Sequence, residues 1–222
     1  MAGLPTRQRA LTAVPGLRFA RQLGTGRGSH MGLGADLCRW ATFAVWDDES
    51  ALDAFLDTSP LAVRWQDQGD ETWSVRLAPL SAHGSWGGAR PLAEIEARSD
   101  PDHDDDHDEA PVAVLTRARI GLRHWPAFYR SVPAVEDHLR HQPGLLAVVG
   151  IGEAPVGLQA TFSLWRSTAS MDAFAYRGSA HEAVVRRTRA EGWFGEELFA
   201  RFRPYASCGT WDDTDPLAVT RR

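Results

Sequence analysis

The chain has 222 residues, of which 43% are hydrophobic, a composition typical of a compact globular protein. No apolar run approaches the ~18–20 residues that a helix needs to cross a bilayer. The two cysteines, Cys38 and Cys208, have neither a CxxC nor a metal-binding spacing, so the sequence predicts a reduced, cytoplasmic setting.

The net charge of −5 is concentrated in one segment, 100–109, which reads DPDHDDDHDE and contains seven acidic residues. The rest of the chain therefore carries a net charge of +2, which argues against a nucleic-acid-binding surface built from clustered basic residues. The segment contains His103 and His107, so a metal-binding tract is one interpretation; a solvated, disordered linker between two halves is the other and is favoured.

In the first half, Gly24–Gly28 reads GTGRG. This stretch lacks the lysine of a phosphate-binding loop and the spacing of a dinucleotide fingerprint, so a turn between two strands is the favoured interpretation over a phosphate site.

The second half is interpreted as six elements in the order β-α-β-β-α-β, the order of a ferredoxin-like unit. Pro133 is expected to kink or split the first helix, and Gly178 to break the second. The elements are expected at 112–119, 125–142, 145–151, 159–165, 168–190 and 199–206.

Four short sequence blocks recur in the same order in both halves, which indicates an internal duplication. The pairs are PGL at 15–17 and 143–145, ATFAVW at 41–46 and ATFSLW at 160–165, DAF at 53–55 and 172–174, and GSW at 84–86 and GTW at 209–211.

The duplication predicts an α+β fold of two tandem ferredoxin-like halves whose sheets form one barrel with the helices outside. The expected division is a first half at 1–97, an acidic linker at 98–110, a second half at 111–216 and a tail at 217–222.

The first half is expected to lack its N-terminal strand and part of its first helix. Residues 111–142 precede Pro143, whereas only 14 residues precede Pro15, a shortfall of 18. We expect either that the true start lies upstream of Met1 or that the barrel lacks a strand, which would leave an unpaired sheet edge.

His181 is the candidate metal ligand. Ser179 and Glu182 have the spacing of a helix capping box, so a helix is expected to restart there. A neutral imidazole on an apolar helix face can bind haem iron, although a core histidine bonded to backbone has the same pattern. The repeat aligns Leu61 with His181. The apolar stripe on which His181 falls includes Phe174, Val185 and Thr188.

Several blocks of the chain resemble the spheroidene monooxygenase family of carotenoid biosynthesis. They are 15–19 (PGLRF), 24–28 (GTGRG), 150–165 (GIGEAPVGLQATFSLW), 174–177 (FAYR), His181, 187–202 (RTRAEGWFGEELFARF) and 209–211 (GTW). The resemblance implies a dimeric α+β barrel-type fold and a haem-dependent oxygenase. Such an enzyme oxidises a linear carotenoid at an allylic methylene to a keto-carotenoid, with molecular oxygen and an electron donor such as a ferredoxin.

On this resemblance His181 is the expected axial ligand of the haem iron. Arg177 and Arg186 are candidates for the haem propionates, with surface ion pairing as the alternative for each. Trp193 is a candidate for lining the cofactor pocket, with plain core packing as the alternative. No catalytic side chain is identified.

Two other function classes remain open at this stage. One is a cofactor-free monooxygenase or isomerase that uses the same barrel, and the other is a non-enzymatic haem-binding protein. A carotenoid-like substrate further implies peripheral membrane contact. The chain is also expected to form a homo-oligomer.

Overall fold

The computed structural model describes residues 11, 13–29, 35–98, 109–154, 157–177 and 191–218. The helices are α2 (Glu49–Thr58), α3 (Pro60–Gln68), α4 (Ala93–Glu96), α5 (Trp125–Arg140) and α6 (Thr168–Arg177), with a 3-10 turn η1 (Leu122–His124). The strands are β1 (Leu17–Gly26), β2 (Ala35–Trp46), β3 (Trp73–Gly84), β4 (Val112–Ile120), β5 (Leu145–Gly152), β6 (Leu158–Trp165) and β7 (Phe194–Gly209).

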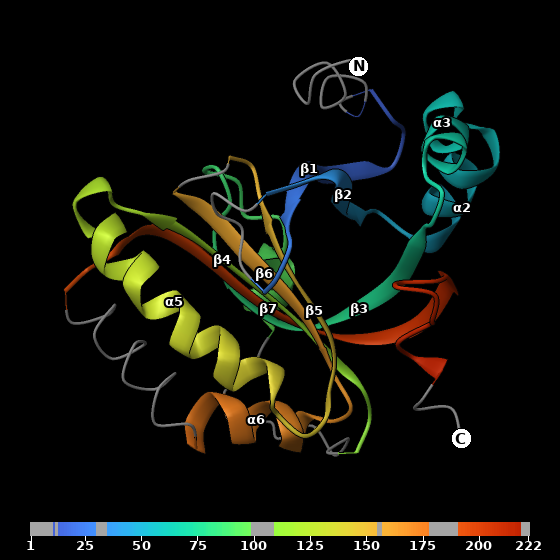
Figure 1. Cartoon of the computed structure of the whole chain (residues 1–222). Coiled ribbons are helices and arrows are strands. Elements are labelled where there is room, and N and C mark those ends of the chain that lie inside the picture. The colour runs from blue at the N-terminus through green and yellow to red at the C-terminus, as the bar shows by residue number, and fades with distance from the viewer. Residues whose placement is uncertain are drawn as a thin grey trace.

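All seven strands form one antiparallel sheet in the order β2-β1-β5-β6-β4-β7-β3. The sheet curls strongly, and α5 and α6 lie on one side of it while α2 and α3 lie beside the strands of the first half (Figure 1). The α+β class is confirmed. Within the part of the chain that the structure describes, β2 pairs only with β1 and β3 only with β7, so both carry an unpaired outer edge.

Alternation along the strands gives the sheet two buried faces. On β4, Ala113 and Leu115 point to the inside of the curl, where they join the largest hydrophobic cluster. Val112 and Val114 point to the other side and pack with α6 residues such as Met171. A third cluster, around Ala20 and Phe55, lies between the first-half strands and α2 and α3.

Corresponding sequence blocks take matching conformations in the two halves. Gly16 and Gly144 both have positive φ, at 73° and 90°, and each precedes a strand. The Gly16 carbonyl accepts the Asp47 N–H at 2.8 Å, and the Gly144 carbonyl accepts the Arg166 N–H at 2.7 Å.

The aromatic residues of the repeated blocks also match. Trp46 packs on Phe55 with ring centroids 5.2 Å apart, and Trp165 packs on Phe174 at 5.4 Å. Trp86 and Trp211 each form an isolated β-bridge to the residue three positions later. These matches support the predicted duplication, which stays a prediction together with the domain boundaries.

Three local expectations were wrong. β1 continues to Gly26, because Gly24 pairs with Gly152 of β5, so the first glycines of GTGRG lie in a strand rather than a turn. Pro133 does not split α5, since buried Val132 and Leu139 hold the helix on both sides of it, and the expected kink, the other form of this expectation, stays a prediction. The last strand is much longer than 199–206 because β3 and β4 pair along different parts of it.

The other elements expected in the second half are confirmed as far as the structure describes them, with α6 ending at Arg177 and residues 178–190 outside the described ranges. None of the described helices is long and apolar enough to span a membrane. Residues 99–108 also lie outside the described ranges, so the linker assignment stays a prediction.

Gly209 offers a test of the tight end of β7. Its φ is +81°, and a Cβ there would lie 2.0 Å from the Thr72 carbonyl oxygen. We therefore expect Gly209→Ala to lower the free energy of unfolding by about 2 kcal/mol or more, measured by chemical denaturation. Gly195→Ala is the control, because a Cβ at Gly195 meets nothing within 4 Å. Equal stability of the two variants would contradict this reading of the turn.

Candidate functional site

Most of the residues predicted to bind the cofactor lie where the structure gives no side chain. His181 and Arg186 are outside the described ranges, and Arg177 is the last residue of α6, with its side chain outside them as well. The assignments of these three residues therefore stay predictions.

Trp193 is described, and it is almost completely buried, with 1% of its surface exposed. Its Nε1 donates to Glu191 Oε2 at 2.7 Å, and its ring stacks on His124 with centroids 5.8 Å apart. These contacts fix the indole at the start of β7, and its role toward a cofactor stays a prediction.

The helix-facing side of the central strand β4 contains one exposed residue, Thr116. Thr116 is exposed although β6 and β7 flank it on both sides. Its neighbour on β7 is Phe199, which stacks on His83 of β3 with ring centroids 5.5 Å apart. Val114, two residues along β4 on the same face, is buried. The neighbour of Thr116 on β6 is Thr161, whose hydroxyl donates to the Ser29 carbonyl at 3.0 Å, so Thr116 has an apolar neighbour on one side and a polar neighbour on the other.

A polar pair lies beside this part of the sheet, between β6 and α5. Gln159 of β6 is buried, and its Nε2 donates to the Tyr129 hydroxyl of α5 at 3.0 Å. Burial raises the pKa of the Tyr129 phenol, although a hydrogen bond from the Gly157 N–H opposes the rise. The phenol is therefore protonated at neutral pH. Sequence reasoning missed this pair, because a helix–strand contact has no local signature.

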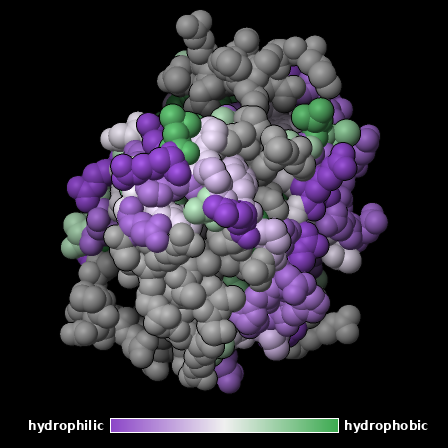
Figure 2. All heavy atoms as spheres, turned by 60° about the vertical axis from the view of Figure 1, so that its left-hand side comes forward, coloured by the Kyte–Doolittle hydropathy of each residue, from purple (hydrophilic) through white to green (hydrophobic). Residues whose placement is uncertain are grey.

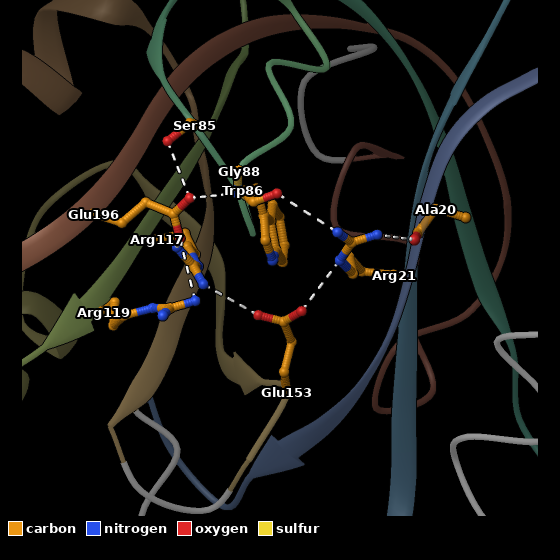
Figure 3. A network of polar contacts seen from close by, with 9 residues as sticks. All are labelled: Ala20, Arg21, Ser85, Trp86, Gly88, Arg117, Arg119, Glu153 and Glu196. Atoms are coloured by element: carbon orange, nitrogen blue, oxygen red, sulfur yellow. Dashed lines mark hydrogen bonds and ion pairs between the residues drawn. The ribbon is translucent and has the colours of Figure 1, made fainter.

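A second polar cluster lies inside the curl of the sheet and centres on Arg117 of β4, whose side chain is 2% exposed (Figure 3). Its guanidinium bonds Glu196 of β7 and Glu153, which follows β5, the latter at 3.2 Å. Glu153 also accepts from Arg21 of β1 at 3.1 Å. The structure gives no acceptor for Arg117 Nε among the described residues.

Glu196 is the most strongly perturbed acid of this cluster. Burial alone would raise the pKa of its carboxyl, but hydrogen bonds from the Gly88 N–H, Arg117, the Gly87 N–H and the Ser85 hydroxyl outweigh it and lower the pKa to about 2. A carboxylate held in this way is a poor proton acceptor at neutral pH. We therefore assign the cluster a structural role.

Sequence reasoning missed the cluster. The one local signal was the run Thr116-Arg117-Ala118-Arg119, in which the two arginines share a strand face with Ala113 and Leu115. Among the described residues, no group of three or more His, Cys, Asp or Glu side chains could hold a metal ion.

The Glu196 cluster predicts a specific acid sensitivity. Because the folded-state pKa of Glu196 lies below its ordinary value of 4.5, its stabilising effect is complete above about pH 4.5 and is lost as the pH falls toward 2. We expect Glu196→Gln to lower the free energy of unfolding by about 2 kcal/mol at pH 7, because partial contact with solvent weakens the electrostatic effect of the carboxylate. The variant should also lose less stability than the wild type between pH 4.5 and 2.

The measurement is urea denaturation at a series of pH values. The control is Glu197→Gln, because Glu197 is exposed and lies on the opposite face of β7. A Glu196→Gln variant with the stability and pH profile of the control would refute the structural role.

Comparison with known proteins identifies close relatives across nearly the whole chain. The chain is 37% identical over 212 residues to spheroidene monooxygenase of Rhodobacter capsulatus, covering 95% of this chain and 85% of that protein. It is 38% identical over 197 residues to that of Rubrivivax gelatinosus (89% and 72% covered) and 34% identical over 212 residues to that of Cereibacter sphaeroides (94% and 63% covered). No family model matches the chain.

Solved structures share the fold at low sequence identity. A crystal structure of aldoxime dehydratase has a TM-score of 0.55 and 15% identity, covering 95% of this chain and 79% of the other. A second aldoxime dehydratase, in complex with butyraldoxime, has a TM-score of 0.50 and 14% identity, covering 90% and 74%. At these identities the likeness concerns the fold alone.

Proposed function

Because this chain belongs to the spheroidene monooxygenase family and is an oxygenase, we propose that it oxidises a linear carotenoid with molecular oxygen at a bound haem. The observation that carries the proposal is the extent of the match, which includes the strands, helices and turns of both halves. The carotenoid is the substrate class that the names of the relatives give. The haem comes from the resemblance of the sequence blocks and from the pattern around His181.

In this proposal the cofactor lies on the helix-facing side of the sheet, where Val114 and Phe199 provide apolar surface beside the exposed Thr116. In this proposal His181 binds the iron and Arg177 and Arg186 pair with the propionates. When bound, haem supplies the oxygen activation that amino-acid side chains cannot provide.

The first half gives indirect support for His181. Its counterpart in the repeat, Leu61, lies in the first turn of α3 behind Ser59, whose hydroxyl accepts the Leu61 N–H at 3.2 Å. Leu61 is half-buried and packs against the cluster beneath α2 and α3. If position 181 has the same place in the second half, its side chain faces the sheet.

The chain's part in the reaction is to bind and orient an apolar polyene and to keep water from it. The apolar cluster formed by β4, β6, α5 and α6, which includes Trp165, Met171 and Phe174, provides the apolar surroundings. In the strand register Thr161 is directly opposite Thr116, and Gln159, which donates to Tyr129, is diagonal to it.

Partners other than the substrate stay proposals. They are an electron donor such as a ferredoxin, a homo-oligomer and peripheral membrane contact to reach a lipid-dissolved substrate. On the face shown in Figure 2, the described hydrophobic residues form small separate groups among hydrophilic ones, so a broad apolar patch is not seen in the described part of that face. The membrane contact therefore rests on the chemistry of the substrate.

We expect protein purified from cells with ample haem supply to show a Soret absorption band, and His181→Ala to lose it. The control is His141→Ala, because His141 follows the last residue of α5 and its side chain is 76% exposed, so this variant should leave haem occupancy unchanged. Full haem occupancy in His181→Ala would eliminate the ligand assignment.

Activity is tested separately. With a reductant and oxygen, the haem-loaded protein is expected to convert a linear carotenoid to its ketone, followed by chromatography of the extracted pigments. Haem binding without product would favour a non-enzymatic haem-binding protein, and product formation by haem-free protein would favour a cofactor-free oxygenase.

A further inference from the structure

The second half has a central strand with no counterpart in the described part of the first half. β4 lies between β6 and β7, whereas β2 and β3 each have an unpaired outer edge among the described residues. Such an edge presents a row of N–H and C=O groups that can bind another strand. The two free edges, at 41–45 of β2 and 73–77 of β3, are therefore candidates for binding a peptide strand.

β2 and β3 match the strands that flank β4. The ATFAVW block of β2 recurs as ATFSLW in β6. β3 (WSVRLAPLSAHG) aligns with residues 198–209 of β7 (LFARFRPYASCG), with Arg, Pro and Gly at the same positions. Gly84 and Gly209, which end the two strands, have positive φ of 97° and 81°. The edges that β4 covers on β6 and β7 thus correspond to the two free edges.

The inner-face side chains along the free edges are less buried than their counterparts beside β4. They are apolar and only partly buried: Ala41, Phe43, Val45, Trp73, Val75 and Leu77. Five of the six counterparts on β6 and β7 are at most 4% exposed: Ala160, Leu164, Leu198, Ala200 and Phe202. In the second half, Ala113 and Leu115 of β4 pack among these residues. A strand with apolar inner-face side chains would bury the first set in the same way.

Helix α2 contacts both strands that carry the free edges. Its Phe55 packs on Trp46 of β2 with ring centroids 5.2 Å apart. Its Glu49 and Asp53 accept hydrogen bonds from Arg76 of β3. In the second half, α6 packs over β4 in the corresponding place. A strand between β2 and β3 would therefore lie beneath α2, as β4 lies beneath α6.

Glu71 and Glu196 have equivalent places beside these edges. Each lies two residues before the first inner-face side chain of its strand edge, Trp73 or Leu198. Each accepts from a hydroxyl and a backbone N–H of a turn: Glu196 from Ser85 at 3.0 Å and Gly88 at 2.7 Å, and Glu71 from Thr210 at 2.8 Å and Asp213 at 2.7 Å. The two carboxylates therefore have the same local geometry.

The two carboxylates differ in their arginine partner. Glu196 binds Arg117 of β4. Within the described part of the chain Glu71 forms no direct ion pair, and Arg39 of β2 bonds Asp212 instead. An arginine at the position of Arg117 in a strand between β2 and β3 would lie beside Glu71 and complete the pair.

We propose that the free edges of β2 and β3 bind one extended peptide strand, antiparallel to both, with the side-chain pattern of β4. Its apolar side chains face the inner cluster at alternate positions, and an arginine at the next such position pairs with Glu71. Main-chain hydrogen bonds to the edges provide affinity, and the alternate side chains provide specificity. The partner is thus a polypeptide segment of this pattern, and its binding is independent of the cofactor and the substrate.

The test uses a fluorescein-labelled peptide with the sequence of residues 110–121, added to the full chain. β4 occupies the corresponding place in the second half, so the free edges are the site available to the peptide. We expect saturable binding by fluorescence anisotropy, with a dissociation constant of about 10 µM or below. Hydrogen exchange should slow at 41–45 and 73–77 when the peptide binds.

Two peptide variants test the orientation of the bound strand and leave the folded chain unchanged. Leu115→Asn in the peptide places an amide on the inner face and should lower affinity at least about 10-fold. Thr116→Asn is the matched control, because Thr116 points to the other face and is exposed in β4. It should change affinity less than about threefold.

The arginine is tested by a double-substitution cycle. The wild-type chain should bind the parent peptide about 10-fold more tightly than the peptide with Arg117→Gln, and Glu71→Gln in the chain should reduce this ratio to about 2 or less. Glu71→Gln keeps an oxygen that can accept from the turn. Asp137→Asn is the control for the lost charge, because Asp137 is 80% exposed on α5, and it should keep the wild-type ratio.

Several results would overturn the proposal. They are absence of binding up to about 100 µM peptide, equal affinity of the Leu115→Asn and Thr116→Asn peptides, or an arginine preference that Glu71→Gln leaves intact. Strong protection of 41–45 and 73–77 in the chain alone, with no change on adding peptide, would show that a second copy or another segment already covers these edges, and it would overturn the proposal as well.

Discussion

The joining of two sets of strands into one curled sheet is the constraint on which the rest of the structure depends. Two seams make this connection, and they differ greatly in strength. β3 and β7 pair over most of their lengths, whereas the described residues of β1 and β5 are registered at two positions, Gly24 with Gly152 and Thr25 with Ile151, followed by one backbone hydrogen bond from Gly150 to Gly28. The short seam needs further support, because two residue pairs alone contribute few ladder hydrogen bonds.

The Arg117 cluster supplies that support. Arg21 of β1 bonds Glu153, which follows the last residue of β5, so this ion pair crosses the weak seam beside the registered residues. Arg117 then ties Glu153 to Glu196 of β7, and Glu196 accepts from the Gly88 N–H after β3. Removing one partner of such a buried set leaves an uncompensated charge, which makes the cluster sensitive to single substitutions.

Aromatic side chains fill the inner face of the curled sheet. Phe43 stacks on Trp86 with ring centroids 5.7 Å apart, and Phe19 and Phe202 pack against this pair. Aromatic side chains therefore occupy the inside of the curl, as expected for a packed core. The exposed Thr116 is on the opposite, helix-facing side of β4.

Periodicity in the sequence predicted the strands and helices of the second half closely, because each element buries one regular face. The repeated PGL, Trp and Phe blocks also marked positions that take matching conformations in the structure. Sequence reasoning could not find the Arg117 cluster or the pair of Tyr129 and Gln159, because each depends on contacts between residues far apart in the chain. It also placed β7 too short, since strand ends depend on the partners available.

The two halves of the chain pack the helix-facing side of the sheet differently. Under α2 and α3, Phe55 is buried and packs against Trp46 and Trp65. Under α5 and α6, the corresponding apolar cluster occupies one end of the face, while Gln159 and the exposed Thr116 lie toward the other. Under the predicted duplication, the two halves have kept matching backbone turns and Trp–Phe contacts, while other side chains on this face differ: aromatic packing dominates in the first half, and the second half combines an apolar cluster with the hydrogen-bonded pair of Tyr129 and Gln159.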